Sequence, residues 1–129
     1  MIIRNREQVE PQDMDLPGSR GVNRRVMIGR DDGAPTFALR VFEVAPGGHT
    51  PRHSHNYEHQ VMVIEGEGQV FGGLDGATIR PIRAGDVVFI APNETHQFRN
   101  VGTQTLRFAC IVPIAFDCGS GQCEPTPGA

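Results

Sequence analysis

The stretch HSHNYEHQVMVIEG, residues 53–66, determines how the rest of the chain is interpreted. It carries three histidines within seven residues, His53, His55 and His59. In an extended strand, side chains at odd-numbered positions share one face. We therefore predict a strand over 53–66 in which all three imidazoles point the same way.

A fourth histidine, His96, stands in the stretch GDVVFIAPNETHQFRN, residues 85–100. Neutral imidazole is the commonest protein ligand for borderline transition metals, so four converging imidazoles are interpreted as a metal site. The plainer alternative is a run of surface or core histidines without a metal. The remaining histidine, His49, precedes the first stretch in a glycine-rich loop, where a non-ligand surface role is expected.

Spacing in the first stretch resembles the cupin family. The first cupin motif is a glycine, five residues, His-x-His, three or four residues, a glutamate, six residues and a glycine. Gly47, His53, His55 and Gly66 fall on this template, and His59 stands where the glutamate is normally found.

The second cupin motif is matched by Gly85, His96 and Asn100. Ala91 replaces its proline and Asn93 replaces its glycine, a mild departure because asparagine also tolerates a left-handed turn. Two motifs at the right separation indicate the family far more specifically than a lone His-x-His.

Length and composition indicate one domain of 129 residues with 26 glycines and prolines. We predict a domain over 1–115 with an N-terminal strand arm, and a flexible tail over 116–129. The net charge of −3 argues against nucleic acid as a partner. No apolar run has membrane-spanning length and no signal-peptide core is visible, so cytoplasmic residence is expected.

Turn residues recur between short apolar runs, which predicts an all-β sandwich or barrel. The resemblance sharpens this to a cupin double-stranded β-helix, a jelly-roll β-barrel with the metal inside its mouth. A covering loop is predicted over 10–21 and a loop over 46–52. Strands are expected at Ile2-Ile3, 23–29, 36–44, 53–66, 67–73, 74–82, 87–91, 96–100 and 105–113.

Strand alternation also predicts the wall of a substrate pocket beside the metal, formed by Val61, Phe98, Phe108 and Cys110. The Cys110 thiol is either a substrate contact and oxidation target or a small buried hydrophobe. Arg40 either presents a cation to an anionic substrate or is an ordinary surface arginine.

Two further cysteines, Cys118 and Cys123, lie in the tail. Their spacing would allow a metal clip or a disulfide, but no second pair accompanies them. Incidental thiols on a flexible tail are the preferred interpretation.

Replacing the usual glutamate by His59 would make every protein ligand neutral, so a divalent ion would keep both positive charges and favour anionic oxygen donors. Four ligands on an octahedral ion leave two positions open for a chelating substrate, or for substrate beside dioxygen. We expect one divalent ion per chain, manganese first, with iron, nickel, zinc or copper as alternatives.

The chain is similar to small manganese-type cupins with four histidine ligands. This resemblance implies a dioxygenase-type oxidoreductase acting on a small oxygenated or unsaturated molecule, and no residue stands out in the sequence as a general base. A non-redox isomerase or lyase and a non-catalytic binding module are the alternatives. The resemblance also implies a homodimer formed by exchange of the N-terminal strand.

Overall fold

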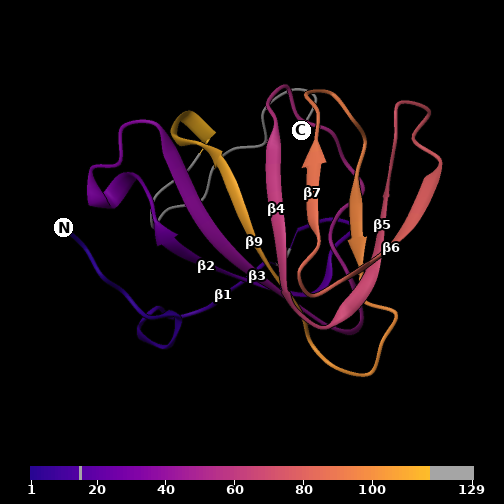
Figure 1. The fold of residues 1–129 in the computed structure, drawn as a ribbon, viewed down its shortest axis with the longest axis horizontal. Coiled ribbons are helices and arrows are strands. Elements are labelled where there is room, and N and C mark those ends of the chain that lie inside the picture. Colours follow the sequence, from indigo (N-terminus) through magenta and orange to yellow (C-terminus); the bar gives the residue numbers. More distant parts are fainter. Residues whose placement is uncertain (15, 117–129) are drawn as a thin grey trace.

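In the computed structural model, the strands form one strongly curled sheet with almost no helix (Figure 1). The structure describes residues 1–14 and 16–116. Strand order along the sheet is β6-β5-β8-β3-β9-β4-β7, with β2 added to β3 and β1 to β2. The strands are β1 Gln12–Asp13, β2 Arg20–Ile28, β3 Phe37–His49, β4 His59–Glu65, β5 Glu67–Gly72, β6 Thr78–Arg83, β7 Val87–Ile90, β8 Gln97–Arg99 and β9 Leu106–Pro113.

The predicted all-β jelly-roll barrel is confirmed, and most strands lie within a few residues of their expected positions. Alternate side chains of the central strands β3, β9 and β4 form the core inside the curl. In the register, Phe42 of β3 and Val63 of β4 both lie opposite Phe108 of β9. The buried cluster consists of Val22, Ala38, Val44, Val61, Val63, Ile82, Phe98, Leu106, Phe108, Cys110 and Val112.

The continuous strand expected over 53–66 is wrong in its first half, because β4 begins only at His59. The backbone of His53 pairs with His96 in an isolated bridge, and the carbonyl of His55 accepts a hydrogen bond from Asn93. His53 and His55 therefore pair with the loop before β8, and residues 53–58 do not form a continuous strand. The loop expected over 46–52 is also shorter than predicted, because β3 continues to His49.

The N-terminal segment differs from its prediction as well. Ile2 and Ile3 belong to no strand of the described chain, and both side chains are exposed. Arg4 holds the segment down, because its guanidinium donates to both carboxylate oxygens of Asp32, at 3.0 and 3.1 Å, and to the Met27 carbonyl at 2.6 Å. The predicted exchange of this segment with a partner subunit stays a prediction.

Two other expectations are not decided by the fold. The tail with Cys118 and Cys123 lies outside the described residues. Within the described part of the chain, no helix is long and apolar enough to span a membrane. The cytoplasmic location stays a prediction.

Candidate metal centre

Backbone hydrogen bonds join the two histidine stretches. The N–H of His53 donates to the His96 carbonyl at 3.2 Å, and the N–H of His96 donates to the His53 carbonyl at 2.9 Å. The turn before His96 is held by Asn93, whose N–H donates to the His55 carbonyl at 2.6 Å and whose φ is 66°. Asparagine tolerates this left-handed conformation. Imidazoles from two distant chain segments are thereby brought side by side.

The ligand atoms of His53, His55 and His96 all lie within 4.8 Å of one another. The Nε2 atoms of His53 and His55 are 3.2 Å apart. Two nitrogens bound to one ion at about 2.1 Å are separated by roughly 3.0 Å in octahedral and 3.4 Å in tetrahedral geometry. These three histidines can therefore hold one metal ion.

His59 lies beside this trio but is not part of the group of three. Its ring centroid is 4.9 Å from that of His55 and 5.0 Å from that of His96. Its Nδ1 lies 3.3 Å from the sulfur of Cys110, and its Nε2 is buried without a hydrogen-bond partner in the described structure. The predicted fourth ligand is therefore adjacent to the site with one nitrogen unengaged.

Burial keeps the histidines neutral, which is the form that binds a metal. It is the largest cause that lowers the pKa of His53 to about 4, of His55 to about 3 and of His59 to about 2, and neighbouring imidazoles and the Arg40 charge lower them further. Burial also lowers the pKa of His96, against the opposing effect of a hydrogen bond with the Glu94 carbonyl.

The donor set fits a divalent transition ion. His96 Nδ1 lies 2.9 Å from the Glu94 carbonyl, so Nδ1–H donates there and Nε2 is left free to bind. Nε2 of His59 is buried without a hydrogen-bond partner among the described residues. Buried polar atoms are normally satisfied, and an ion bound by the neighbouring histidines would satisfy this nitrogen.

The side chains expected to form an apolar wall are all buried on the inner face of the sheet. Val61, Phe98, Phe108 and Cys110 are each at most 5% exposed. The rings of Phe98 and Phe108 stack at a centroid distance of 4.6 Å, and Phe42 also stacks on Phe108, at 5.4 Å. Phe42 was missed by the sequence analysis, although its two-residue spacing from Arg40 puts both on one face.

Tyr57 is a second residue that the sequence analysis could not place. Its ring stacks on His55 at 4.8 Å with an interplanar angle of 11°, and it lies 5.0 Å from the ring of His59. Burial raises the pKa of its hydroxyl, which therefore stays protonated at neutral pH. Position 57 is on the odd-numbered face of the strand predicted over 53–66, so strand parity was a signal for Tyr57 that the sequence analysis did not use.

Arg40 lies on the inner side of β3, contrary to the surface alternative. It pairs in register with Cys110, and its Nη2 lies 3.7 Å from the Cys110 sulfur. Its guanidinium also sits 5.1 Å from the centroid of Phe42. The side chain is half-buried and its Nε has no hydrogen-bond partner in the described structure. A positive charge therefore stands next to the histidines.

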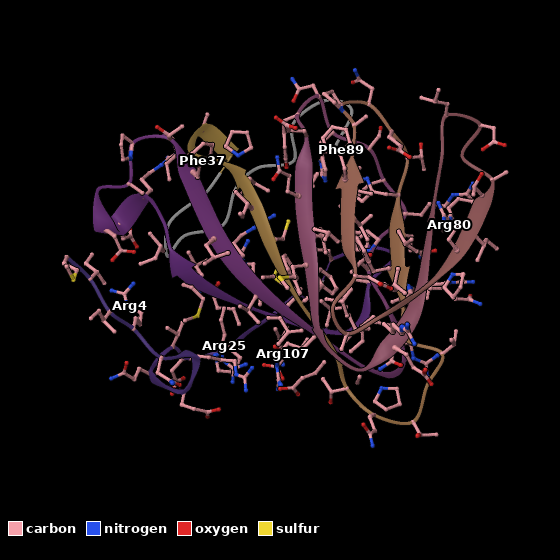
Figure 2. All side chains as sticks on the ribbon, in the orientation of Figure 1. Arg4, Arg25, Phe37, Arg80, Phe89 and Arg107 are labelled. Carbon is pink, nitrogen blue, oxygen red and sulfur yellow. The ribbon has the colours of Figure 1, made fainter. Side chains whose placement is uncertain are left out.

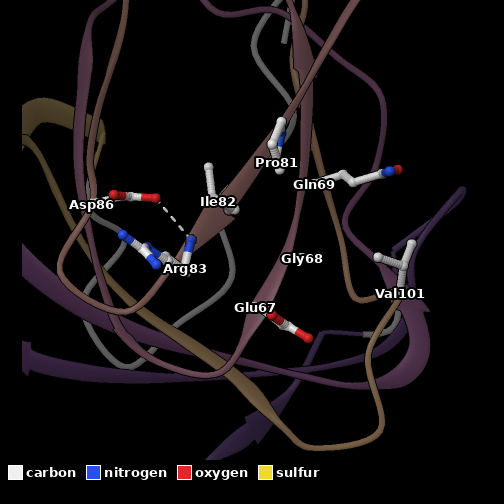
Figure 3. Close-up of a pocket in the computed structure, with 8 residues that line it drawn as sticks. All are labelled: Glu67, Gly68, Gln69, Pro81, Ile82, Arg83, Asp86 and Val101. Atoms are coloured by element: carbon white, nitrogen blue, oxygen red, sulfur yellow. Dashed lines mark hydrogen bonds between the residues drawn. The ribbon is translucent and has the colours of Figure 1, made fainter.

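The other polar candidates lie apart from this group. His49 has its Nδ1 3.4 Å from the side-chain nitrogen of Gln97 and forms none of the close ring contacts of the cluster. Glu58 is exposed. A surface hollow of about 330 Å³ lies elsewhere, at the base of the β5–β6 hairpin, and its lining includes Glu67, Arg83 and Val101 but none of the histidines (Figure 3).

Known proteins with similar sequences carry several different names. The 1-methylthio-D-xylulose 5-phosphate methylsulfurylase of Rhodospirillum rubrum is 36% identical over 93 residues, 72% of this chain and 56% of that protein. The chain thus spans little more than half the length of that relative. The L-ectoine synthase of Halomonas elongata is 32% identical over 114 residues, 86% of this chain and 79% of that protein.

Among solved structures, the polyketide cyclase RemF from Streptomyces resistomycificus superposes with a TM-score of 0.82 and 33% identity, over 88% of this chain and 80% of that chain. A cupin 2 conserved barrel domain protein from Rhodopseudomonas palustris superposes with a TM-score of 0.71 and 34% identity, over 84% and 72% of the two chains. Residues 40–112 match the family described as Cupin domain. On its fold, its two histidine motifs and these relatives, the chain belongs to the cupin family.

Proposed function

We propose that this protein is a metal-dependent enzyme that promotes ring closure or elimination in a small, oxygen-rich organic substrate. The proposal rests on one observation above all: the His53, His55 and His96 group lies beside side chains that suit non-redox chemistry. These are the protonated hydroxyl of Tyr57, the cation of Arg40 and the stacked rings of Phe98 and Phe108. Relatives named polyketide cyclase and L-ectoine synthase support the same class of reaction.

Each group has a distinct part in this proposal. A bound divalent ion would polarise a carbonyl oxygen of the substrate as a Lewis acid. Tyr57 holds a proton at its hydroxyl and can donate it to a departing or newly formed oxygen. Phe98 and Phe108 exclude water, which favours loss of water over its addition and strengthens electrostatic interactions at the site.

The ion is proposed to be manganese, with His59 as a fourth ligand; iron, nickel, zinc and copper are the alternatives. Support for His59 comes from its buried Nε2, which lacks a partner in the described structure, and from its ring contacts with His55 and His96. A set of four neutral imidazoles would leave the ion with its full charge. Such a centre favours anionic or chelating oxygen ligands.

A dioxygenase-type reaction is the second candidate. The observation that favours it is the water-excluding aromatic wall of Phe42, Phe98 and Phe108 beside neutral nitrogen donors, which would suit a redox-active ion. A non-catalytic cupin that binds a small molecule is the third possibility, because an ion with open positions also suits simple ligand capture.

Reconstitution of the purified protein with single metals separates these candidates. The manganese, iron, nickel and zinc forms are incubated with poly-β-carbonyl compounds and hydroxy acids, and dehydrated or cyclised products are followed by mass spectrometry while oxygen is monitored. Product formed with zinc as well as manganese, without oxygen uptake, is the expected result. Turnover that requires oxygen and a redox-active metal would establish the dioxygenase instead, and no turnover with any metal would favour the binding protein.

We further propose that the protein is a homodimer formed through the outer face of the sheet. Two rows of side chains run across β3, β9, β4 and β7 there, and five of their apolar members are at least 36% exposed. Large exposed apolar patches mark interaction sites. The five are Leu39, Ile111, Phe89, Met62 and Val87.

Charge supports a second copy as the occupant of this face. Next to the apolar rows, Glu43 pairs with both Arg25 and Arg107, and Arg107 also pairs with Glu65. Arg25 and Arg107 are labelled in Figure 2. Because these charges are paired within the chain, they leave little net charge on this face to oppose a second copy across a two-fold axis. The exposed Ile2 and Ile3 are available for exchange between the two chains.

A further inference from the structure

We infer that Arg40 is the anion-binding half of the substrate site: it pairs with a carboxylate or enolate oxygen of a substrate whose neighbouring oxygen reaches the metal. This inference deepens the proposed function and rests on it. It specifies the substrate class as a compound with two oxygen functions close together, one of them anionic. Neither the fold nor the family match assigns a role to this residue.

The position of Arg40 is the first argument. Within β3 it shares the inner face with Ala38 and Phe42, and it lies directly opposite Cys110 in the register. Its Nη2 lies 3.7 Å from the Cys110 sulfur, and the same sulfur lies 3.3 Å from Nδ1 of His59. The guanidinium therefore lies two contacts away from the histidine group, and we infer that a small substrate contacts both.

The lack of a counter-charge is the second argument. In residues 1–14 and 16–116, no carboxylate forms an ion pair with Arg40; the sulfur of Cys110 is a weak acceptor, and the Nε is buried and unbonded. Buried charges are normally paired, because removing them from water is costly. An anionic ligand would provide the missing partner.

The outer face of the same sheet shows the contrast. Arg25 and Arg107 project there from β2 and β9, and both pair with the carboxylate of Glu43 (Figure 2). These two arginines thus have a carboxylate partner on a neighbouring strand. Among the described residues Arg40 has no carboxylate partner on the inner face, which is the pattern expected of an arginine that pairs with a ligand.

The charge of Arg40 acts on three of the four histidines. Its charge contributes to lowering the pKa values of His53, His55 and His59, although burial contributes more. The planar guanidinium fork matches the two oxygens of a carboxylate or of a β-dicarbonyl enolate. In the proposed reaction, Arg40 would therefore stabilise negative charge on the oxygen that the metal does not hold.

Binding of a simple dianion tests this inference. Full-length manganese-reconstituted protein is titrated by calorimetry with malonate, and separately with neutral imidazole as a ligand of the metal alone. Arg40→Met removes the charge at similar length, and Arg40→Lys keeps the charge without the fork. Arg80→Met is the control, because it removes the same charge from an exposed position on β6 (Figure 2).

We expect Arg40→Met to weaken malonate binding about 10- to 100-fold, in line with loss of a charge-assisted hydrogen bond, while imidazole affinity stays unchanged. Arg40→Lys should be intermediate and Arg80→Met should match the wild type. Unchanged malonate affinity in Arg40→Met, or an equal loss in Arg80→Met, would overturn the inference. If Arg40→Met does not fold, the comparison of Arg40→Lys with the wild type decides, and equal affinities would overturn the inference.

Failure of the proposed function gives a different result. Wild-type protein that takes up manganese and imidazole but no malonate overturns the role of Arg40 and leaves the metal-dependent enzyme standing. If the wild-type protein takes up no divalent metal, the proposed function is overturned, and the inference about the anion site is overturned with it.

Discussion

The sulfur of Cys110 lies 3.3 Å from Nδ1 of His59, and the same sulfur lies 3.7 Å from Nη2 of Arg40. Arg40 can only donate, so the sulfur accepts a hydrogen bond on that side. If Nδ1–H of His59 also donates to the sulfur, the lone pair of His59 falls on Nε2, which is buried without a partner in the described structure. The thiol then plays the positioning part that a carbonyl or carboxylate plays for other metal-binding histidines.

Removing this sulfur should weaken metal binding without destroying it. In Cys110→Ala, His59 loses the acceptor that fixes its tautomer, and manganese affinity is expected to fall about tenfold. Cys110→Ser keeps an acceptor and should lie closer to the wild type. Competition with a fluorescent chelator measures both affinities, and an affinity in Cys110→Ala equal to that of the wild type would show that the thiol only fills space.

His96 should be indispensable for metal occupancy. It belongs to the group of three whose ligand atoms lie within 4.8 Å, and it is 4% exposed. We expect His96→Ala to lose most bound metal when measured by elemental analysis after gel filtration. His49→Ala is the matched control and should retain full occupancy, because His49 contacts Thr50 and Gln97 instead of the cluster. Full occupancy in His96→Ala would remove it from the ligand set.

His59→Glu should keep the metal but bind anions more weakly. A glutamate at this position adds one negative charge beside the ion, so the centre attracts anionic oxygen donors less strongly. Malonate affinity is expected to fall, while imidazole affinity is retained. Equal or tighter malonate binding in this variant would contradict the argument that the all-histidine site keeps its full positive charge.

The metal-free protein should become less stable as pH falls below 6.5. The pKa of His53 is lowered to about 4 and that of His55 to about 3, from an ordinary value of 6.5, and burial is the largest cause. Between pH 6.5 and about 4 the unfolded chain therefore binds protons that the folded chain excludes, and acidification favours unfolding.

Thermal unfolding of metal-free protein at pH 7.5, 6.0 and 4.5 measures this dependence. Tm should fall across the series, and His55→Asn should show a shallower fall because it removes one of the excluded protonation sites. An identical pH dependence in the variant and the wild type would assign the effect to carboxylates instead.

Motif spacing predicted the site better than strand parity did. The assumption that 53–66 is one strand is wrong, yet His53 and His55 still meet His96, because the bridge between His53 and His96 supplies the alignment. Gly66 shows why such motifs carry fold information: its φ is 83°, and a Cβ there would lie 2.4 Å from the Thr105 carbonyl. Only glycine fits that corner between β4 and β5.

Strand parity agrees with the burial of side chains in the regular strands. Val61 of β4 and Phe108 and Cys110 of β9 are buried as parity indicated, because burial alternates along both strands there. Phe98 is buried too, in the three-residue strand β8, and the role of these residues as a pocket wall stays a prediction. Arg40 was not resolved, because a charged residue inside a barrel contradicts the usual preference. Pairing between the distant strands β3 and β9 places it opposite Cys110, and such pairing cannot be read from local sequence.

The outer face of the sheet supplies the last prediction. Phe89 on β7, labelled in Figure 2, and Leu39 on β3 belong to one row of register-paired side chains. Phe89 is 61% exposed. If a second copy covers this row, Phe89→Asp places an unpaired charge inside the interface and should shift the protein to monomers. Light scattering coupled to gel filtration measures the mass. Leu74→Asp is the control, because Leu74 is 98% exposed in the turn between β5 and β6 and away from this face. A wild type that is already monomeric, or a Phe89→Asp variant that stays dimeric, would show that this face is not the dimer interface.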